Sequence, residues 1–154
     1  MDVSQEQQVV DLFNTIDARL GSLTGLVNNA GILLPQMLVE QMDAERINRL
    51  LTTNVTSYFL CCREAIKRMA LTHEGQGGAI VNVSSAAARL GAAFEYVDYA
   101  ASKGAIDTLT RGLSIEVARA IAWLLSEDAS YVTGSYRYNF GAVMGVSKAN
   151  FTPV

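Results

Sequence analysis

The chain has 154 residues, of which half are hydrophobic, so its length and composition predict one domain with a sizeable core. Fifteen acidic residues against twelve basic ones give a net charge of -3, and no Lys/Arg cluster is present, which argues against a nucleic-acid partner. The longest apolar runs are far shorter than the ~20 residues of a membrane span, and the start MDVSQEQQ lacks a signal-peptide pattern. A soluble, cytoplasmic protein is therefore predicted.

The first half of the chain predicts helices on either side of a buried strand. Apolar residues at helical spacing indicate an amphipathic helix over residues 4–20, which Gly21 ends. The run LTGLVNNAG, residues 23–31, is typical of a buried parallel strand that leads into a loop. Asp43 is placed to cap the next helix, and a further helical stretch covers residues 55–71.

The second half continues this alternation. GQGG interrupts the helical pattern, and AIVNVSS, residues 79–85, predicts a second strand. Asp98 is placed to cap a helix that carries Tyr99 and Lys103. Alternating helices and strands with short connections predict a doubly wound α/β fold with a parallel sheet, in which ligands bind beyond the carboxyl ends of the strands. The polar clusters that follow both strands should therefore line one crevice.

Three kinds of site are disfavoured. Cys61 and Cys62 are adjacent in an apolar helical pattern, where they are expected to be small buried side chains rather than a disulfide or a metal pair. His73 is the only histidine, so no metal site is predicted. A serine hydrolase is disfavoured because no G-x-S-x-G turn surrounds Ser84 or Ser85.

Tyr99 and Lys103 are four residues apart, so a helix places both on one face. A phenol with the ordinary pKa of about 10 is a poor base at neutral pH, but a neighbouring ammonium favours the phenolate. Ser85 at a strand end can donate a hydrogen bond to a substrate oxygen. Taken singly, these features also suit a surface pair or a turn, and Asn54 suits a helix cap. Together they indicate interconversion of a carbonyl and an alcohol, which requires a hydride carrier.

Four segments resemble the short-chain dehydrogenase/reductase family: LVNNAG, TTNVTSYFLCCREAIKRM, GGAIVNVSS and YAASKGAIDTLTRGLSIEVA. The resemblance covers roughly residues 2–117. It implies a Rossmann-like fold and an oxidoreductase that uses NAD or NADP to interconvert a secondary alcohol and a ketone. The partner would then be a small-molecule carbonyl or alcohol substrate.

The resemblance also implies roles for individual residues. Tyr99 would be the catalytic acid/base, and Lys103 would acidify the phenol and hold the nicotinamide ribose. Ser85, with Ser84 as the runner-up, would bind the substrate oxygen. Asn54 would hold a water in a proton relay. The other cofactor-binding positions would be Asp2 near the adenine ring, and Asn28, Ala30 and Gly31 on the adenosine side.

The chain departs from the family pattern in two places. The family's first two strands, and its T-G-x-x-x-G-x-G turn for the pyrophosphate, have no counterpart after Met1. Near Val117, LSIEVA runs directly into RAIAWLLSEDASYVTGS, which predicts an internal deletion that also removes the P-G strand region. The expected fold is thus an incomplete Rossmann-like sheet over residues 1–135, followed by a divergent, poorly packed tail over residues 136–154.

The deletion has a consequence for assembly. Helical spacing continues across the junction, so two helices are expected to fuse into one of about 28 residues. Its exposed apolar surface predicts a homo-oligomer through the helices that start near Asn54 and Tyr99. The alternative is a non-catalytic truncated relative, either a gene remnant or a dimerising partner, that keeps the tetrad without a complete cofactor pocket.

Overall fold

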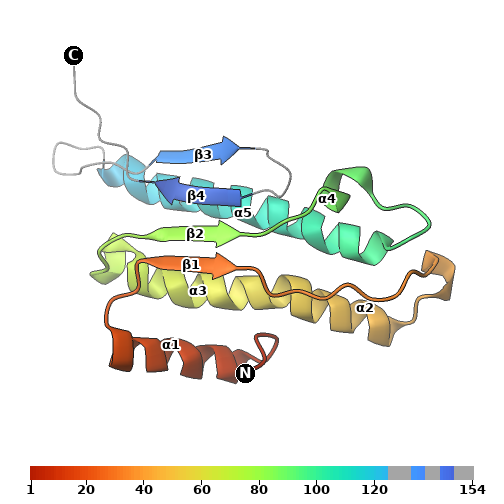
Figure 1. Cartoon of the computed structure of the whole chain (residues 1–154). Helices are drawn as coiled ribbons and strands as arrows, with labels where there is room; N and C mark the ends of the chain where they lie inside the picture. Colours follow the sequence, from red (N-terminus) through yellow and green to blue (C-terminus); the bar gives the residue numbers. More distant parts are fainter. Residues whose placement is uncertain (125–132, 138–142, 148–154) are drawn as a thin grey trace, which may run out of the picture.

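The computed structural model describes the backbone of residues 1–124, 133–137 and 143–147, and side chains within residues 1–116. Helices alternate with short strands along the chain (Figure 1). The main elements are α1 (Glu6–Leu20), β1 (Gly25–Asn28), α2 (Ala44–Leu51), α3 (Ser57–Met69), β2 (Ala79–Asn82), α4 (Ala87–Leu90), α5 (Val97–Leu124), β3 (Thr133–Arg137) and β4 (Val143–Ser147).

The two central strands form a parallel pair, as predicted. Their register runs from Gly25 opposite Ala79 to Asn28 opposite Asn82. The backbone N–H of Val83 donates to the carbonyl oxygen of Asn28 at 2.9 Å, so the loops that follow both strands start at the same edge of the sheet. β3 and β4 pair antiparallel in a second sheet, with β4 alongside β2 (Figure 1).

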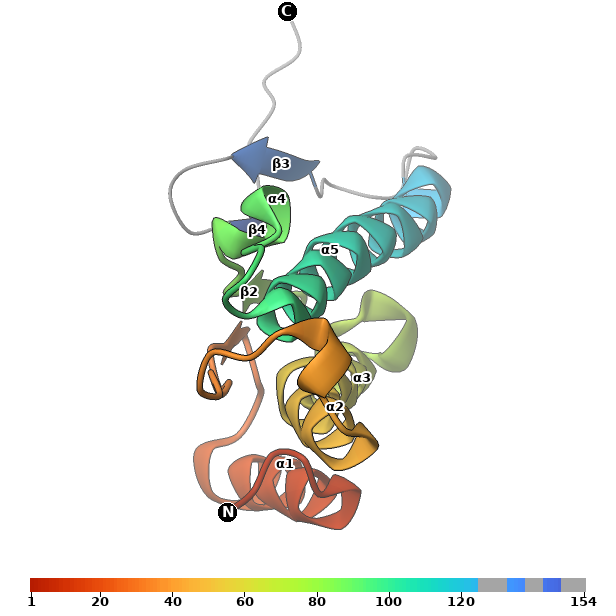
Figure 2. The same cartoon turned by 90° about the vertical axis from the view of Figure 1, so that its right-hand side faces the viewer.

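Helices α1, α3 and α5 lie on one side of the β1–β2 pair, which is clearest in the end-on view of Figure 2. The main hydrophobic core of the described residues lies between α1, α3 and the sheet face that these helices cover. On the other side of the sheet, the side chain of Val27 is 66% exposed. The core side chains are Val9, Phe13, Cys61, Ala65 and Met69.

Local signals in the sequence set the helix boundaries. The Asp43 carboxylate accepts a hydrogen bond from the N–H of Arg46 at 2.8 Å, which confirms the predicted cap of α2. Gly21, with φ of 80°, ends α1 as predicted, because glycine adopts positive φ without a steric penalty. α1 begins at Glu6 rather than Ser4, since Ser4 is held in a turn by the Asp2 carboxylate.

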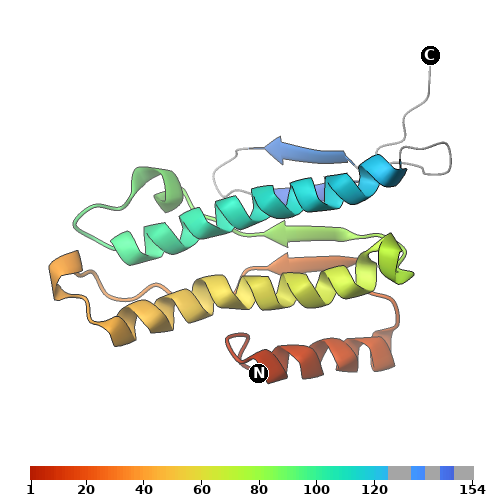
Figure 3. The same cartoon turned by 180° about the vertical axis from the view of Figure 1, so that it is seen from behind.

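α5 is one continuous helix of 28 residues, which confirms the predicted fusion across the junction (Figure 3). Asp98 lies inside this helix, one residue after its start, rather than before it. β3 runs across residue 135, the predicted domain boundary, and β4 lies within the tail. The side-chain packing predicted for that tail lies outside the described residues.

Two further predictions concern individual side chains and membrane spans. Cys61 and Cys62 are both free and buried, as expected from their position in an apolar helix. Among the described residues, no helix combines the length and apolarity needed to cross a bilayer.

Candidate active site

The predicted catalytic residues come from three elements that meet where β1 and β2 end. A π-helical turn, Thr52–Thr56, joins α2 to α3 and carries Asn54. Ser85 follows β2, while Tyr99 and Lys103 lie in the first turns of α5. These four residues, with Gly31 after β1, are called the strand-end site below.

Lys103 is the central charge of this site. Its side chain is buried, only 3% exposed, and its ammonium donates to the carbonyl oxygen of Val83 at 2.8 Å. The Nζ atom also lies 5.8 Å from the centre of the Tyr99 ring. Burial lowers the pKa of Lys103, and the nearby carboxylate of Asp107 partly opposes this. The ammonium of Lys103 thus lies near the Tyr99 ring, as their spacing on one helix face predicts.

Asn54 is fully buried, and its side chain forms three hydrogen bonds. Its Oδ1 accepts from the N–H of Ile32 at 2.7 Å, and its Nδ2 donates to the carbonyl oxygen of Ile32 at 2.9 Å and to Ser102 Oγ at 3.2 Å. Asn54 therefore ties the loop after β1 to α5. This contact explains why a residue in the middle of a helical run is polar and buried.

Gly31 lies close to both groups. A Cβ atom at this position would be 3.2 Å from Asn54 Oδ1 and 3.9 Å from Lys103 Nζ. Ala30 and Asn29, the residues before it, are exposed. The backbone of the loop after β1 thus comes close to the ammonium of Lys103 at Gly31, where no side chain intervenes.

The two serines have different surroundings. Ser84 is buried, and its hydroxyl donates to the carbonyl oxygen of Lys103 at 3.3 Å. Ser85 is half-buried, and its Oγ accepts from the N–H of Ala87 at 3.2 Å. Because that contact uses a lone pair, the Ser85 hydroxyl proton can still be donated to a ligand. This difference favours Ser85 over Ser84 for binding a substrate oxygen.

The start of α5 is fixed by a buried ion pair. Arg46 Nε lies 2.9 Å from the Asp98 carboxylate, and both side chains are at most 10% exposed. The second carboxylate oxygen of Asp98 accepts from the N–H of Tyr99 at 2.9 Å. Arg46 also donates to the carbonyl oxygen of Pro35 at 2.8 Å. The ion pair therefore links α2 and the loop after β1 to the turn that presents Tyr99.

The remaining predicted cofactor-binding residues lie in other surroundings. The Asn28 amide points toward α3, where it donates to Asn82 Oδ1 at 2.8 Å and to Cys62 Sγ at 3.3 Å. Asp2 is exposed and accepts from Ser4, whose hydrogen bonds lower the pKa of its carboxyl group. Neither side chain contacts the strand-end site in the part of the chain that the structure describes.

Sequence reasoning missed several buried polar residues near this site. Asn82 donates to Thr110 Oγ1 at 3.1 Å, so a row of polar groups runs from β1 through β2 to α5. Tyr58 contacts Lys103, and its hydroxyl oxygen is 3.4 Å from the ammonium nitrogen. The signal for Asn82 was a polar residue within the otherwise apolar run AIVNV. The aromatic Tyr58 carries no comparable signal, because it fits an ordinary core position.

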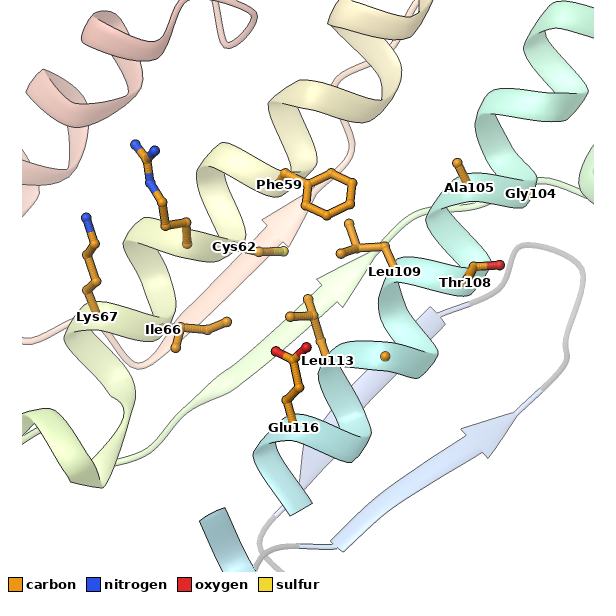
Figure 4. Close-up of a pocket in the computed structure, with 12 residues that line it drawn as sticks. Phe59, Cys62, Ile66, Lys67, Gly104, Ala105, Thr108, Leu109, Leu113 and Glu116 are labelled. Carbon is orange, nitrogen blue, oxygen red and sulfur yellow. The ribbon is translucent and has the colours of Figure 1, made fainter. Parts of the chain in front are cut away.

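A separate open groove of about 850 Å³ lies between α3 and α5 (Figure 4). Phe59, Cys62, Leu109 and Leu113 point toward its middle. None of the four predicted catalytic residues lines it. The lining residues are Phe59, Cys62, Arg63, Ile66, Lys67, Gly104, Ala105, Thr108, Leu109, Gly112, Leu113 and Glu116.

Comparison with known proteins identifies relatives over most of the chain. The profile of a family described as short chain dehydrogenase matches residues 1–122. The uncharacterized oxidoreductase YgfF of Escherichia coli is 52% identical over 182 positions, which cover 88% of this chain and 74% of that protein. Since the chain has only 154 residues, this alignment leaves positions of YgfF unmatched, as an internal deletion would.

Other relatives are more distant and longer. The 3-beta-hydroxysteroid dehydrogenase of Comamonas testosteroni is 36% identical over 96% of this chain, which corresponds to 56% of its own length. Among solved structures, ElxO with NADP bound superimposes with a TM-score of 0.71 at 34% identity, covering 78% of this chain and 47% of that one. The chain thus spans about half the length of these two proteins.

Proposed function

The chain belongs to the short-chain dehydrogenase/reductase family, and on that premise we propose that it supports NAD(P)-dependent hydride transfer between a secondary alcohol and a ketone. The observation that carries the proposal is the buried Lys103 ammonium beside the Tyr99 ring, at the edge where β1 and β2 end. The site residues would be Asn54, Ser85, Tyr99 and Lys103. The fold is an α/β fold of the Rossmann-like type, with a parallel sheet that is incomplete relative to the family.

The residues present fit a nicotinamide cofactor on its ribose side. A solved relative, ElxO, has NADP bound, and the corresponding cofactor here would be NAD or NADP. A Cβ at Gly31 would crowd Asn54 Oδ1 at 3.2 Å, so glycine lets the loop after β1 pack closely against Asn54 and Lys103. Lys103 would hold the ribose hydroxyls through a remaining N–H of its ammonium. When bound, the cofactor supplies or accepts the hydride.

The protein's own groups would handle the proton and the oxygen. Ser85 would donate to the carbonyl oxygen of the substrate and stabilise the negative charge that develops there. Tyr99 would give its phenolic proton to that oxygen during reduction and remove it during oxidation. Lys103 would stabilise the phenolate that results. Asn54, which holds the loop after β1 against α5, would keep these groups in place and order a water next to the lysine.

A second proposal concerns assembly. The α3–α5 groove is open and mostly apolar, and Phe59, which lines it, is 53% exposed. We propose that a second copy of the chain covers this groove, because exposed apolar surface of this kind is usually covered in solution. The homo-oligomer would then form through α3 and α5, away from the strand-end site.

The alternative function is a non-catalytic relative that keeps the tetrad. The observation that favours it is coverage: the chain matches 47% of ElxO, and Val27 on the second face of the sheet is 66% exposed. A serine hydrolase is less favoured still, because Ser84 is bonded to backbone and there is no histidine near either serine among the described residues.

The test combines binding with turnover. NADPH and NADH would be titrated against the protein by nicotinamide fluorescence, and reduction of a panel of ketones would be followed by loss of absorbance of the reduced cofactor. We expect binding of one cofactor, and turnover that Tyr99→Phe lowers by about a thousandfold while the melting temperature is kept. Tyr96→Phe, which removes a neighbouring phenol that does not contact Lys103, is the matched control.

Each alternative has its own outcome. Cofactor binding without turnover, or no binding at all, would favour the non-catalytic relative. Hydrolysis of an activated ester that Ser85→Ala abolishes would favour the hydrolase.

A further inference from the structure

Tyr58 is a fully buried phenol that the roles described so far do not use. It lies on α3, four residues after Asn54, and its side chain is 1% exposed. Its hydroxyl donates to the carbonyl oxygen of Val83 at 3.1 Å. That one hydrogen bond would satisfy a buried tyrosine, so its other contacts need an explanation.

The Lys103 ammonium, the Tyr58 hydroxyl and the Val83 carbonyl are all hydrogen-bonded to one another. Lys103 Nζ donates to Tyr58 Oη at 3.4 Å and to the carbonyl oxygen of Val83 at 2.8 Å. The same Nζ lies 5.3 Å from the centre of the Tyr58 ring and 5.8 Å from that of Tyr99. Two of the three ammonium protons are thus directed into the protein, and one remains for a ligand on the Tyr99 side.

The chemistry of each group suits this arrangement. A phenol can donate one hydrogen bond and accept another at the same time, and a carbonyl oxygen has two lone pairs. Tyr58 therefore donates to Val83 and accepts from Lys103 without competition. Burial, together with the nearby Tyr99 and Cys62 groups, raises the pKa of Tyr58 to about 12, so its phenol stays neutral throughout the ordinary pH range.

We propose that Tyr58 is a positioning residue for Lys103: its hydroxyl and the Val83 carbonyl together hold the ammonium at the end of β2, beside Tyr99. The proposal deepens the proposed function and rests on it for its catalytic meaning. A lysine side chain has four rotatable bonds, and a fixed acceptor on α3 restricts where its charge lies. Tyr58 would therefore act through Lys103 and not on the substrate.

The direct test is the titration of Lys103 in the protein without cofactor. The chain has three lysines, at positions 67, 103 and 148, so ¹³Cε-lysine NMR gives few signals, and Lys103→Met assigns the relevant one. Tyr58→Phe keeps the ring and removes the acceptor of the ammonium. The charged form then loses stabilisation, and we expect the pKa of Lys103 to fall below its value in the unmodified protein. Tyr96→Phe is the matched control and should leave this titration unchanged.

The groups around the lysine have to be held constant in this comparison. Tyr99 and Asp107 face Lys103 from its own helix, and Tyr58 faces it from α3. Only the Tyr58 hydroxyl changes in the variant. An unchanged Lys103 titration in a folded Tyr58→Phe protein would overturn the proposal.

If Tyr58→Phe does not fold, the same pair can be tested from the other side. In Lys103→Met protein labelled with ¹³Cζ-tyrosine, the Tyr58 hydroxyl loses the ammonium that donates to it, so the Tyr58 signal should move at neutral pH. A Tyr58 signal at the same position as in the unmodified protein would also overturn the proposal.

Activity measurements separate this inference from the proposed function. In an active protein, Tyr58→Phe should lower kcat about tenfold, the effect of losing one hydrogen bond to a charged group, and leave KM for the ketone unchanged. If the unmodified protein is inactive but the Lys103 titration shifts in Tyr58→Phe, the proposed function fails and the placement of the lysine by Tyr58 stands. If turnover occurs but the Lys103 titration does not shift in Tyr58→Phe, the proposed function stands and the placement of the lysine by Tyr58 fails.

Discussion

The strand-end site and the α3–α5 groove share α5 but are held in different ways. In the strand-end site, Asn54 and Lys103 are buried and bonded to neighbouring segments, Asn54 to Ile32 and Ser102 and Lys103 to Val83. In the groove, small residues such as Gly104 and Gly112 alternate with apolar ones and leave open volume. The difference is that buried polar bonds fix the first region, whereas the second is an open and mostly apolar surface.

Polar bonding also explains why the two regions are separate. The row formed by Asn28, Asn82 and Thr110 runs on the sheet side of α5. Cys62 lies at the boundary, since it bonds to Asn28 and also lines the groove. Changes on the sheet side should therefore affect folding, and changes on the groove side should affect assembly.

The largest effect is expected at the centre of the polar row. Asn82→Ala removes hydrogen bonds to Asn28 and Thr110 and leaves buried polar groups without partners, which should lower the free energy of unfolding by about 3 kcal/mol. Urea unfolding followed by circular dichroism measures this. Asn48→Ala, at an exposed position, is the control and should change the value by less than about 0.5 kcal/mol. Equal losses of unfolding free energy in Asn82→Ala and Asn48→Ala would contradict a stabilising role of the polar row.

The next effect concerns the thiol at the boundary. Burial is the main cause that raises the pKa of Cys62 to about 11, from an ordinary 9.0. Because the thiolate is the reacting form, alkylation of Cys62 in a Cys61→Ser background should be about a hundredfold slower than that of a free thiol at the same pH. Labelling with iodoacetamide followed by mass spectrometry, in buffer and in urea, tests this. Fast labelling of the folded protein would mean that the groove exposes the thiol.

A smaller effect is expected from the ion pair at the start of α5. Arg46→Met leaves the buried Asp98 carboxylate without its cation, although the N–H of Tyr99 still donates to it. We expect a loss of about 2 kcal/mol in the free energy of unfolding, less than for a fully buried pair. Adding Asp98→Asn should recover part of the loss, because the unpaired charge is then removed. A double mutant no more stable than Arg46→Met would argue against the pair.

The smallest effect on folding is expected in the groove. Phe59→Lys replaces a side chain that is 53% exposed, so the free energy of unfolding of a single chain should change by less than about 0.5 kcal/mol. The same change should convert the proposed dimer to a monomer, because it places a charge in the buried interface. Light scattering at micromolar concentration gives the oligomeric state. An unmodified protein that is already monomeric would contradict the proposed assembly.

Much of the fold could be predicted because its signals are local. The Asp43 cap, the Gly21 stop and the two apolar strand runs each depend on a few neighbouring residues. The 28-residue length of α5 followed from the helical spacing across residue 117. α5 starts two residues earlier than an Asp98 cap predicts, and the Asp98 carboxylate pairs with Arg46, which is distant in sequence.

The candidate site was less predictable, because its contacts join residues far apart in the chain. The pairing of Tyr99 with Lys103 could be inferred from their spacing, whereas the contact of Lys103 with Tyr58 spans 45 residues. The amide of Asn28, a residue expected to border a cofactor, bonds to Cys62 and Asn82, which are 34 and 54 residues away in the chain. Side-chain direction at a strand end depends on register and on the helix packed below, neither of which the local sequence determines.

Because α5 is continuous, the number of residues at its junction determines which way the side chains beyond the junction face. Each residue of an α-helix advances the chain by about 100°, so one residue inserted near position 117 would turn everything beyond it by about a quarter of a revolution. Insertions of about four, seven or eleven residues come close to whole revolutions and would return the distal part to nearly its present azimuth. Variants whose length differs at this point should therefore be tolerated in steps of that size.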